Sequence, residues 1–351
     1  LSFALSFFFY NASLGIMTPF LQLFLKGKGY TASLIGLMLG VYELAGVLGP
    51  IALGALGDRT GHFRRIMSGS ILLVVALFVL QYLNTWTALA FLLIAPMGFL
   101  YKSHFSLIDA YASHTLPAFE RNYGKARLAG SLGFFAAALV VQLTGWIDAS
   151  SLLSIIIGFG LMATIYAVAV QFLPRATVHI DAGPPKISVA ALKSFPPVFW
   201  AGIAVVFLMV MSMASHYYFF SLFVQERFGV SRVSGFWAIG PLAEVPFIFF
   251  SGYLIKKFNV SRLLLVSLIA GTIRLYIYFL SPAIAPLYVV QLLHGLTYGT
   301  LHTSALAFIR RRSPVEHRGL GIALYIAIGF GLAGFVGSSL GGWIVDLFGY
   351  N

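Results

Sequence analysis

The sequence has few charged residues and no cysteine. Charged side chains make up 9% of its 351 residues, whereas a soluble domain carries about 25%. Too few charges are present to coat a water-exposed surface, and 60% hydrophobic residues with a mean hydropathy of +0.93 indicate a protein that crosses a membrane several times. The absence of cysteine excludes disulfides, thiolate nucleophiles and cysteine-ligated metals.

Basic tracts interleaved with stacking aromatic residues, which a nucleic-acid groove needs, are also absent. The net charge of +12 comes instead from Lys and Arg in short connections between apolar runs. The first run, LSFALSFFFYNASLG, has no basic region before it, so we expect a membrane span rather than a cleavable signal. We therefore expect a lipid bilayer around the protein and no nucleic-acid partner.

Eleven apolar runs have the roughly 20 residues that a membrane-spanning helix needs. All are expected to be α-helices, because isolated strands leave backbone groups unpaired in lipid. The sequence thus predicts an all-α membrane protein with spans at residues 1–25, 33–56, 66–83, 87–112, 124–146, 151–173, 198–224, 234–255, 261–281, 286–309 and 319–346.

Lys and Arg are distributed unequally between the two sets of alternate connections. One set holds only Lys26, Lys28, Arg227 and Arg232. By the positive-inside rule the other set is cytoplasmic, which puts the N-terminus on the cytoplasmic side of the cell membrane. That richer set comprises Arg59, Arg64, Arg65, Arg121, Lys125, Arg175, Lys186, Lys193, Lys256, Lys257, Arg262, Arg310, Arg311, Arg312 and Arg318.

A polar connection at residues 174–197, with five prolines and mixed charge, predicts a cytoplasmic linker between two bundles, 1–173 and 198–351. LAGSLGFFAAALVVQLTGWI before the linker resembles GFGLAGFVGSSLGGWIVDLFG after it, and both contain Gly-Trp-Ile. Paired repeats are typical of transporters. We therefore expect two six-helix bundles, the second with five helices in this chain and a twelfth outside it.

Ionisable residues inside the predicted spans are the main candidates for function, because a charge in lipid costs about 2.5–3.5 kcal/mol on insertion scales. Three are acidic and three are basic, so they can neutralise one another around a polar cavity between helices. They are Glu43, Lys102, Asp109, Arg127, Glu244 and Arg274, joined by the histidines His104, His216, His294 and His302.

Asp109 with Arg127 predicts a substrate or proton site, and the alternative is a static ion pair between two spans. Lys102 lies about two helical turns before Asp109 and is expected on the same face. Glu43 and Glu244 are carboxylates in apolar surroundings, which suits proton uptake and release near neutral pH. His104 and His216 are more typical of interhelical hydrogen bonds, and cavity or structural roles are both open for Asn11, Tyr42, Gln291 and Tyr298.

The connection GALGDRTGHFRR, residues 54–65, predicts a conformational latch. Asp58 can receive the N-terminus of a neighbouring helix, Gly61 permits a tight turn, and Arg59 holds the basic face. Two other patterns carry no site. GFGLAG at residues 329–334 matches a dinucleotide fingerprint but lies inside a predicted span, and the spacing of His294 and His302 fits no zinc motif.

Several segments resemble the major facilitator superfamily. GALGDRTGHFRR is similar to its loop between helices two and three, and LIDAYASH with NYGKARLAGSLGF resembles the lactose permease segment whose acid and arginine contact the sugar, here Asp109 and Arg127. GTIRLYIYF and QLLHGLTYGTLH resemble helices nine and ten, whose coupling arginine and histidine match Arg274 and His294. The resemblance implies the major facilitator fold and the branch of lactose permease, nucleoside–proton symporters and phenylpropionate permease.

Two positions depart from lactose permease. The acid one turn after its helix-ten histidine is Thr297 here, and its helix-eight acid falls on Pro241, with Glu244 one turn later. Proton uptake is therefore expected at Glu244, Asp109 or Glu43. GPLAEVPF and the doublet of His294 and His302 look more like the phenylpropionate and nucleoside relatives.

Together these features predict a proton-coupled symporter of a small polar or aromatic solute (a sugar, a nucleoside or an aromatic carboxylate). It needs no cofactor beyond the proton, binds no metal and acts as a monomer in the cell (inner) membrane. The substrate-binding candidates are Asp109, Arg127, Lys102, Asn11, Tyr298 and Gln291, and the proton-coupling candidates are Glu244, Arg274, His294, Glu43 and His302.

The alternatives are a proton-linked exporter of drugs or metabolites, a membrane enzyme and a receptor. An enzyme would need a nucleophile–base pair or a metal cluster near one membrane face, and the sequence offers neither. A receptor would need a connection long enough to form a signalling domain, and none is present.

Overall fold

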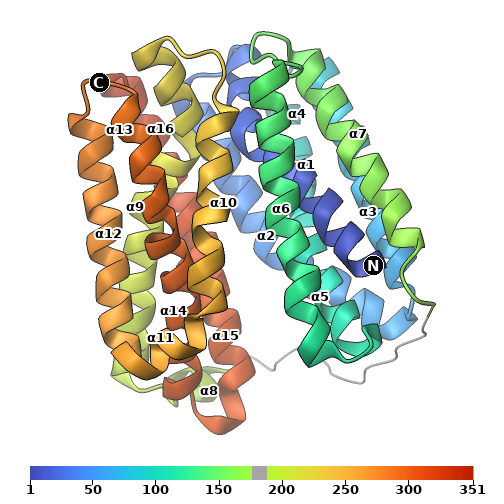
Figure 1. The fold of residues 1–351 in the computed structure, drawn as a ribbon, viewed down its shortest axis with the longest axis vertical. Coiled ribbons are helices and arrows are strands. Elements are labelled where there is room, and N and C mark those ends of the chain that lie inside the picture. Colours follow the sequence, from blue (N-terminus) through green and yellow to red (C-terminus); the bar gives the residue numbers. More distant parts are fainter. Residues whose placement is uncertain (176–187, 351) are drawn as a thin grey trace.

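The computed structural model describes residues 1–175 and 188–350, and all regular structure within these ranges is helical. The helices form two sets that stand side by side (Figure 1). The first set consists of α1 Ser2–Gly27, α2 Ala32–Thr60, α3 Phe63–Leu83, α4 Thr87–Tyr101, α5 Ser103–Thr115, α6 Phe119–Thr144 and α7 Leu152–Gln171.

The second set begins after a short helix, α8 Val189–Lys193. This second set contains four helical turns of other types: the 3-10 turns η1 Gln291–Leu293 and η3 Val315–His317, and the π turns η2 Gly295–Gly299 and η4 Ala327–Leu332. Its α-helices are α9 Pro197–Phe228, α10 Ser234–Phe249, α11 Ser251–Phe258, α12 Val260–Leu280, α13 Ala285–Val290, α14 Thr300–Arg312, α15 Arg318–Ile326 and α16 Ala333–Phe348.

The predicted all-α architecture is confirmed, and each predicted span falls on helical turns. In the described part of the chain, nine helices are long and apolar enough to cross a membrane, and the bent pair α10–α11 gives a tenth. The predicted span 286–309 is interrupted by η1 and η2, and the span 87–112 is two helices that meet at Lys102. The predicted linker, 174–197, contains α8, and most of the rest of it, Lys186 included, lies outside the described residues.

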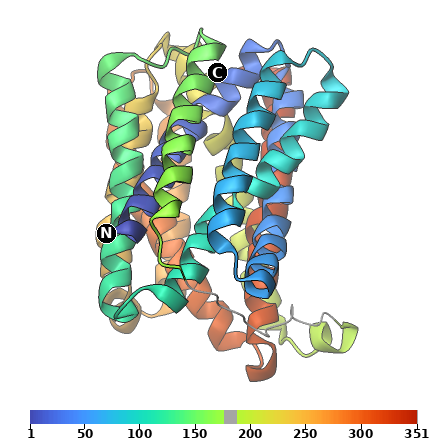
Figure 2. The ribbon, with the colours of Figure 1, turned by 90° about the vertical axis from the view of Figure 1, so that its right-hand side faces the viewer.

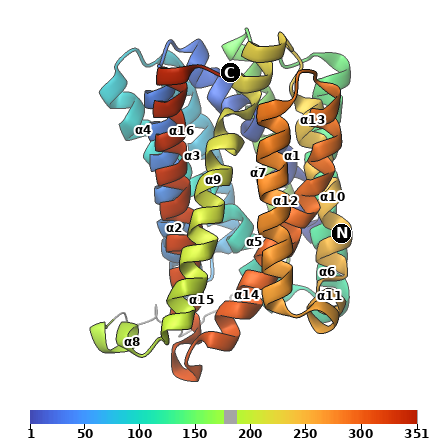
Figure 3. The same cartoon turned by 90° about the vertical axis from the view of Figure 1, so that its left-hand side faces the viewer.

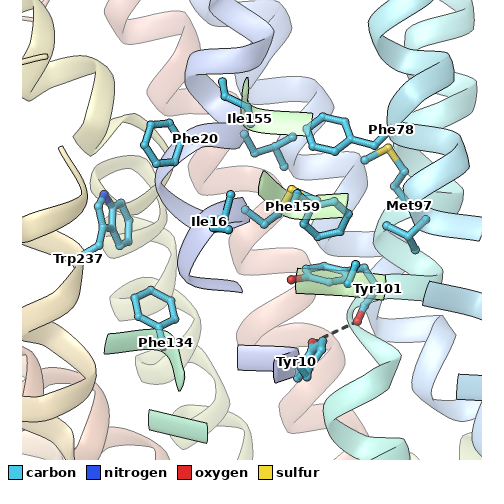
Figure 4. Packing of buried hydrophobic residues seen from close by; sticks show 14 of the residues in the cluster. Tyr10, Ile16, Phe20, Phe78, Met97, Tyr101, Phe134, Ile155, Phe159 and Trp237 are labelled. Atoms are coloured by element: carbon cyan, nitrogen blue, oxygen red, sulfur yellow. Dashed lines mark hydrogen bonds between the residues drawn. The ribbon is translucent and has the colours of Figure 1, made fainter. Parts of the chain in front are cut away.

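Aromatic side chains and hydroxyls hold the first set together (Figure 4). The Tyr10 hydroxyl donates to the Tyr101 carbonyl at 3.1 Å, so α1 is tied to α4. His104 is fully buried, and its ring nitrogens contact the Ser70 hydroxyl at 3.2 Å and the Tyr166 hydroxyl at 3.0 Å. The prediction of an interhelical hydrogen bond at His104 is therefore confirmed.

Glycine permits the close crossing of α2 and α4. A Cβ at Gly98 would meet the backbone of Tyr42, which cannot move aside as a flexible side chain can. We expect Gly98→Val to lower the free energy of unfolding by about 1–3 kcal/mol, because the helices must separate to admit the new side chain. Thermal unfolding of the purified protein measures this, and Gly69→Val is the matched control, since a Cβ there meets nothing within 4 Å; equal losses would contradict the argument.

The two helix sets are joined tightly at one end, which we call the closed end. The Asp346 carboxylate on α16 accepts hydrogen bonds from the Ala32 and Ser33 backbone N–H groups at 2.9 and 2.8 Å, and so caps α2 across the boundary between the sets. Beside this cap, a Cβ at Gly36 of α2 would collide with the Ser338 carbonyl of α16. On the other flank, the Gln142 side chain of α6 accepts from the Gly235 N–H of α10 at 2.9 Å.

The sets diverge toward the opposite end, which we call the open end and which carries α8 and the α14–α15 connection (Figures 1 and 3). Among the described residues, α5 packs on helices of the first set, and α14 packs on helices of the second. The extensive contacts between the sets are made by α2 with α16 and with η4, by α6 with α10, and by α1 with α9. Figure 2, which faces the first set, shows α8 beyond the ends of the long helices.

Candidate functional site

A cavity of about 330 Å³ lies between the two helix sets, and we call it the central cavity. Helices of both sets supply its walls, which are mainly apolar and tyrosine-rich with a few ionisable groups. Its lining residues are Leu14, Met17, Thr18, Leu21, Gln22, Leu39, Tyr42, Glu43, Lys102, Val210, Ala214, Tyr217, Tyr218, Glu244, His294, Tyr298, Phe330 and Gly334.

Glu43 sits where the helix sets meet. Its carboxylate on α2 forms an ion pair with Lys102 and also accepts a hydrogen bond from the Tyr218 hydroxyl of α9, in the other set. The side chain of Glu43 is 11% exposed and that of Lys102 is 33% exposed. Lys102 therefore pairs with Glu43 and not with Asp109, and its aliphatic stem packs at Gly46 of α2.

A second cluster links Glu244 of α10 to Arg274 of α12 through His294. His294 Nε2 lies 2.9 Å from the Glu244 carboxylate, and His294 Nδ1 lies 3.2 Å from Arg274 Nη1. Because a guanidinium only donates, Nδ1 must accept, and the proton of a neutral ring is then on Nε2, where it is donated to Glu244. Arg274 and the acid are thus connected by an imidazole and make no direct contact.

Irregular helical turns present the His294 side of this cluster. The α13–α14 segment passes through η1 and the π turn η2, and π turns are frequent at functional sites. The Thr297 hydroxyl in η2 accepts from Arg274 Nη1 at 2.7 Å, and Gln291 Oε1 in η1 accepts from Arg274 Nη2 at 3.0 Å. The predicted residues His294, Gln291 and Arg274 are therefore brought together.

A smaller cavity of about 80 Å³ lies beside Arg274, and we call it the side cavity. Three residues, Tyr217, His294 and Tyr298, line both it and the central cavity, so the two adjoin. Its walls are mostly aromatic and consist of Phe134, His216, Tyr217, Phe220, Phe236, Trp237, Gly240, Pro241, Arg274, Gln291, His294 and Tyr298.

Asp109 and Arg127 form an ion pair nearer the open end. Arg127 Nη1 lies 3.1 Å from Asp109 Oδ2, and the Tyr123 hydroxyl bridges them with contacts of 2.9 Å to each. Both side chains are about one-third exposed, and the guanidinium stacks 4.3 Å above the Phe105 ring. Neither residue lines the central or the side cavity.

A family profile described as the MFS_1 like family matches residues 1–351. The chain belongs to this major facilitator family. The transporter is 29% identical to the probable 3-phenylpropionic acid transporter of Escherichia coli (strain K12), over 99% of this chain and 92% of that protein. It is 25% identical to the maltose permease of Geobacillus stearothermophilus, over 98% of this chain and 87% of the permease.

A crystal structure of the nucleoside transporter NupG superposes on the transporter with a TM-score of 0.83 at 19% identity, covering 99% of this chain and 91% of that one. The major facilitator fold predicted from the sequence motifs is therefore confirmed. Family and neighbours are membrane transporters and not enzymes, which sets aside the membrane-enzyme alternative.

Some predicted residues of the transporter lie away from the cavities. The Asn11 amide donates to the Phe7 carbonyl at 2.9 Å and packs against Gly130, so it serves the contact of α1 with α6. His302 is exposed on α14, where Nδ1 lies 3.2 Å from the Tyr325 hydroxyl. Neither residue lines the central cavity: Asn11 lies about one turn before the lining residue Leu14, and His302 lies about one turn after the lining residue Tyr298, both toward the open end.

The predicted latch lies at the open end of the transporter. Gly61 ends α2 with φ +67°, and its N–H donates to the Gly57 carbonyl at 2.8 Å. Asp58 is half-buried, and among the described residues it has no ion pair; Arg59 beside it is exposed. Among the described residues, no group of three or more histidines and carboxylates is placed to hold a metal.

Two tyrosines of the site were missed by the sequence reasoning. Tyr217 lines both cavities, and Tyr218 bonds to Glu43 across the boundary between the sets. Their only sequence signal is the polar pattern SHYYFF inside an apolar span. His216, beside them, stacks on Tyr278 with ring centroids 4.1 Å apart and lines the side cavity.

Proposed function

We propose that this transporter couples the entry of a small polar or aromatic solute to the entry of protons. The observation that carries the proposal is the placement of Glu43, Lys102, Glu244 and His294 on one cavity between two helix sets. Charged groups in a membrane mark ion and substrate paths when they line a cavity rather than lipid. The relatives are named for phenylpropionate, maltose and nucleoside transport, which agrees with a small organic solute.

Glu43 and Glu244 are the proposed proton carriers, because each holds a cavity-facing contact that depends on its negative charge. Protonating Glu43 would weaken its ion pair with Lys102 at the boundary between the sets. Protonating Glu244 would remove the acceptor of His294 Nε2. Both changes alter contacts that an alternating-access cycle must break and re-form.

Solute contacts are proposed for Lys102 and Tyr298 in the central cavity and for Gln291 in the side cavity. Asp109 and Arg127 lie between the cavity level and the open end of their helices, where they would contact the solute as it leaves or enters. This division replaces a single Asp109–Arg127–Lys102 site. The protein would work as a monomer, since both helix sets of one chain supply the cavity.

The open end is proposed to face the cytoplasm. The connections at this end carry most of the Lys and Arg residues, which the positive-inside rule places inside. The structure then corresponds to an inward-open state with the N-terminus cytoplasmic. When the open end closes, Asp58 and Arg59 would contact the second helix set and act as the latch.

We expect Glu244→Gln to abolish uphill, pH-driven uptake and to spare downhill exchange. The amide keeps the shape of the carboxyl but cannot take up a proton, so the pH gradient loses one carrier. The measurement is solute accumulation in proteoliposomes with an imposed pH gradient, compared with exchange at equal pH. Glu226→Gln, which changes an exposed carboxylate of the same helix set, is the control, and unchanged accumulation in Glu244→Gln would refute the coupling role.

A further inference from the structure

Arg274 is a deeply buried cation without a carboxylate in contact among the described residues. It is 2% exposed, and a guanidinium keeps its charge at any ordinary pH. The partners of its two Nη atoms are neutral groups, and its Nε has no partner in the described part of the chain. The neutral partners of the two Nη atoms are His294 Nδ1, the Thr297 and Tyr278 hydroxyls and Gln291 Oε1.

The other cations inside the helix bundle are already neutralised. Lys102 pairs with Glu43, and Arg127 pairs with Asp109. The acid nearest to Arg274 along its contacts is Glu244, and it is separated from Arg274 by the imidazole of His294. A buried charge without an opposite charge is costly, so Arg274 is the cation in this cluster that gains most from an added anion.

The side cavity gives an anion access to Arg274. Its volume of about 80 Å³ is below the roughly 300–1,000 Å³ of a pocket that holds a whole small molecule. It is large enough for one functional group, and its aromatic walls can turn their positive ring edges toward an anion. Because Tyr217 and Tyr298 line both cavities, a solute in the central cavity can place one end beside Arg274.

The central cavity favours an apolar body on that solute. Leu14, Met17, Leu39, Val210 and Phe330 supply much of its wall. The many hydroxyls of a sugar would lose hydrogen bonds to water there without replacement, which costs free energy. An aromatic ring would instead pack on the aliphatic side chains and on the two shared tyrosines.

We propose that Arg274 binds the carboxylate of an aromatic monocarboxylate, with the acid group in the side cavity and the ring in the central cavity. The planar guanidinium fork matches a carboxylate in geometry as well as in charge. This inference rests on the proposed transport function and assigns the substrate class. It also gives Arg274 a direct role in holding the solute, in place of a role confined to proton coupling.

The first test uses the unmodified protein and three probes: 3-phenylpropionate, its primary amide and sodium chloride. The carboxylate is expected to raise the melting temperature of the purified protein in a concentration-dependent manner, because a ligand of the folded state stabilises it. The amide, of nearly the same shape, is expected to bind at least about tenfold more weakly, since hydrogen bonds to a charged group are the stronger ones. Equal binding of the amide, or stabilisation by chloride but not by the carboxylate, would overturn the proposal.

The second test changes the protein. Arg274→Gln is expected to weaken carboxylate binding by at least about tenfold. The control Arg227→Gln removes an arginine of the same set whose contacts in the described part of the chain are a main-chain carbonyl and aromatic rings, and it should bind as the unmodified protein does. Loss of binding in Lys102→Gln with full binding in Arg274→Gln would place the anion at Lys102 and overturn the proposal.

A further variant, Thr297→Asp, tests the anion position beside Arg274 if Arg274→Gln does not fold. The new carboxylate would stand beside Arg274 Nη1, where the Thr297 hydroxyl now lies at 2.7 Å, and would occupy the anion position from within. A folded Thr297→Asp protein should therefore lose carboxylate binding, and undiminished binding would overturn the proposal. Proton-driven uptake of maltose or a nucleoside, with no uptake of 3-phenylpropionate, would also overturn the proposed substrate class while leaving the transport function intact. If none of these solutes is taken up, both the substrate class and the proposed transport function are refuted.

Discussion

Glu43→Ala is expected to eliminate uphill uptake and to destabilise the protein. Without the carboxylate, Lys102 keeps its charge inside the membrane with no opposite charge in contact, and Tyr218 loses its acceptor across the boundary between the sets. Breaking a buried ion pair costs about 3–5 kcal/mol. Because Lys102 is one-third exposed to the cavity, solvent screens its charge, and we expect a loss of about 2 kcal/mol, below that range.

The paired change separates the two effects of Glu43. In the double variant Glu43→Gln with Lys102→Met, both charges are removed, so stability should return close to that of the unmodified protein. Coupling should not return, because no acid remains at this position to carry a proton. Thermal unfolding and proteoliposome uptake measure the two outcomes. Normal uphill uptake in Glu43→Ala, or a double variant less stable than Glu43→Ala, would count against the role of the pair.

Asp346→Ala is expected to open the closed end. The carboxylate caps the α2 backbone of the other helix set with two charge-assisted hydrogen bonds. A bond of this kind is worth about 1.5–3 kcal/mol when buried, and less at an exposed residue such as Asp346. A net loss of about 1–2 kcal/mol would shift the population toward the state open at this end by roughly 5- to 30-fold.

Thiol labelling measures this shift without background, because the sequence contains no cysteine. With Leu21→Cys as the reporter in the central cavity, a membrane-impermeant reagent added from the closed-end side should react several-fold faster in the Asp346→Ala protein. Asp148→Ala is the matched control, since Asp148 lies in the α6–α7 connection, is exposed, and bonds within its own connection to the Ser150 N–H at 2.9 Å. Identical rates in the two variants would show that the cap does not hold the closed end.

Much of the fold could be predicted because its main determinant is local. A run of about 20 apolar residues must form a spanning helix in lipid, so each predicted span falls on helical turns. The break at Lys102 and the π turn at Gly295–Gly299 were not predicted. Both are single-turn irregularities inside apolar runs, and such irregularities leave little trace in apolar periodicity.

The candidate site was predictable only in part. Buried charge identified Glu43, Lys102, Glu244 and Arg274, and the helix-ten resemblance added His294. Which acid contacts which base depends on how distant helices cross, so the pairing of Lys102 with Glu43 rather than a position near Asp109 could not be derived from helical spacing. Asp346 was missed because a carboxylate at a helix end has the same sequence pattern as any solvated turn.

Two spin-label distances test the central claim, that the paired charges lie around a cavity whose two ends open in turn. Labels at Ser150 and Ser231 report on the closed end, and labels at Ser113 and Glu316 report on the open end, all at exposed positions. Adding a proton load together with a transported solute should lengthen the first distance and shorten the second, and Glu43→Gln should alter the balance between the two states. Distances that stay fixed under all conditions, or that lengthen together, would contradict the account.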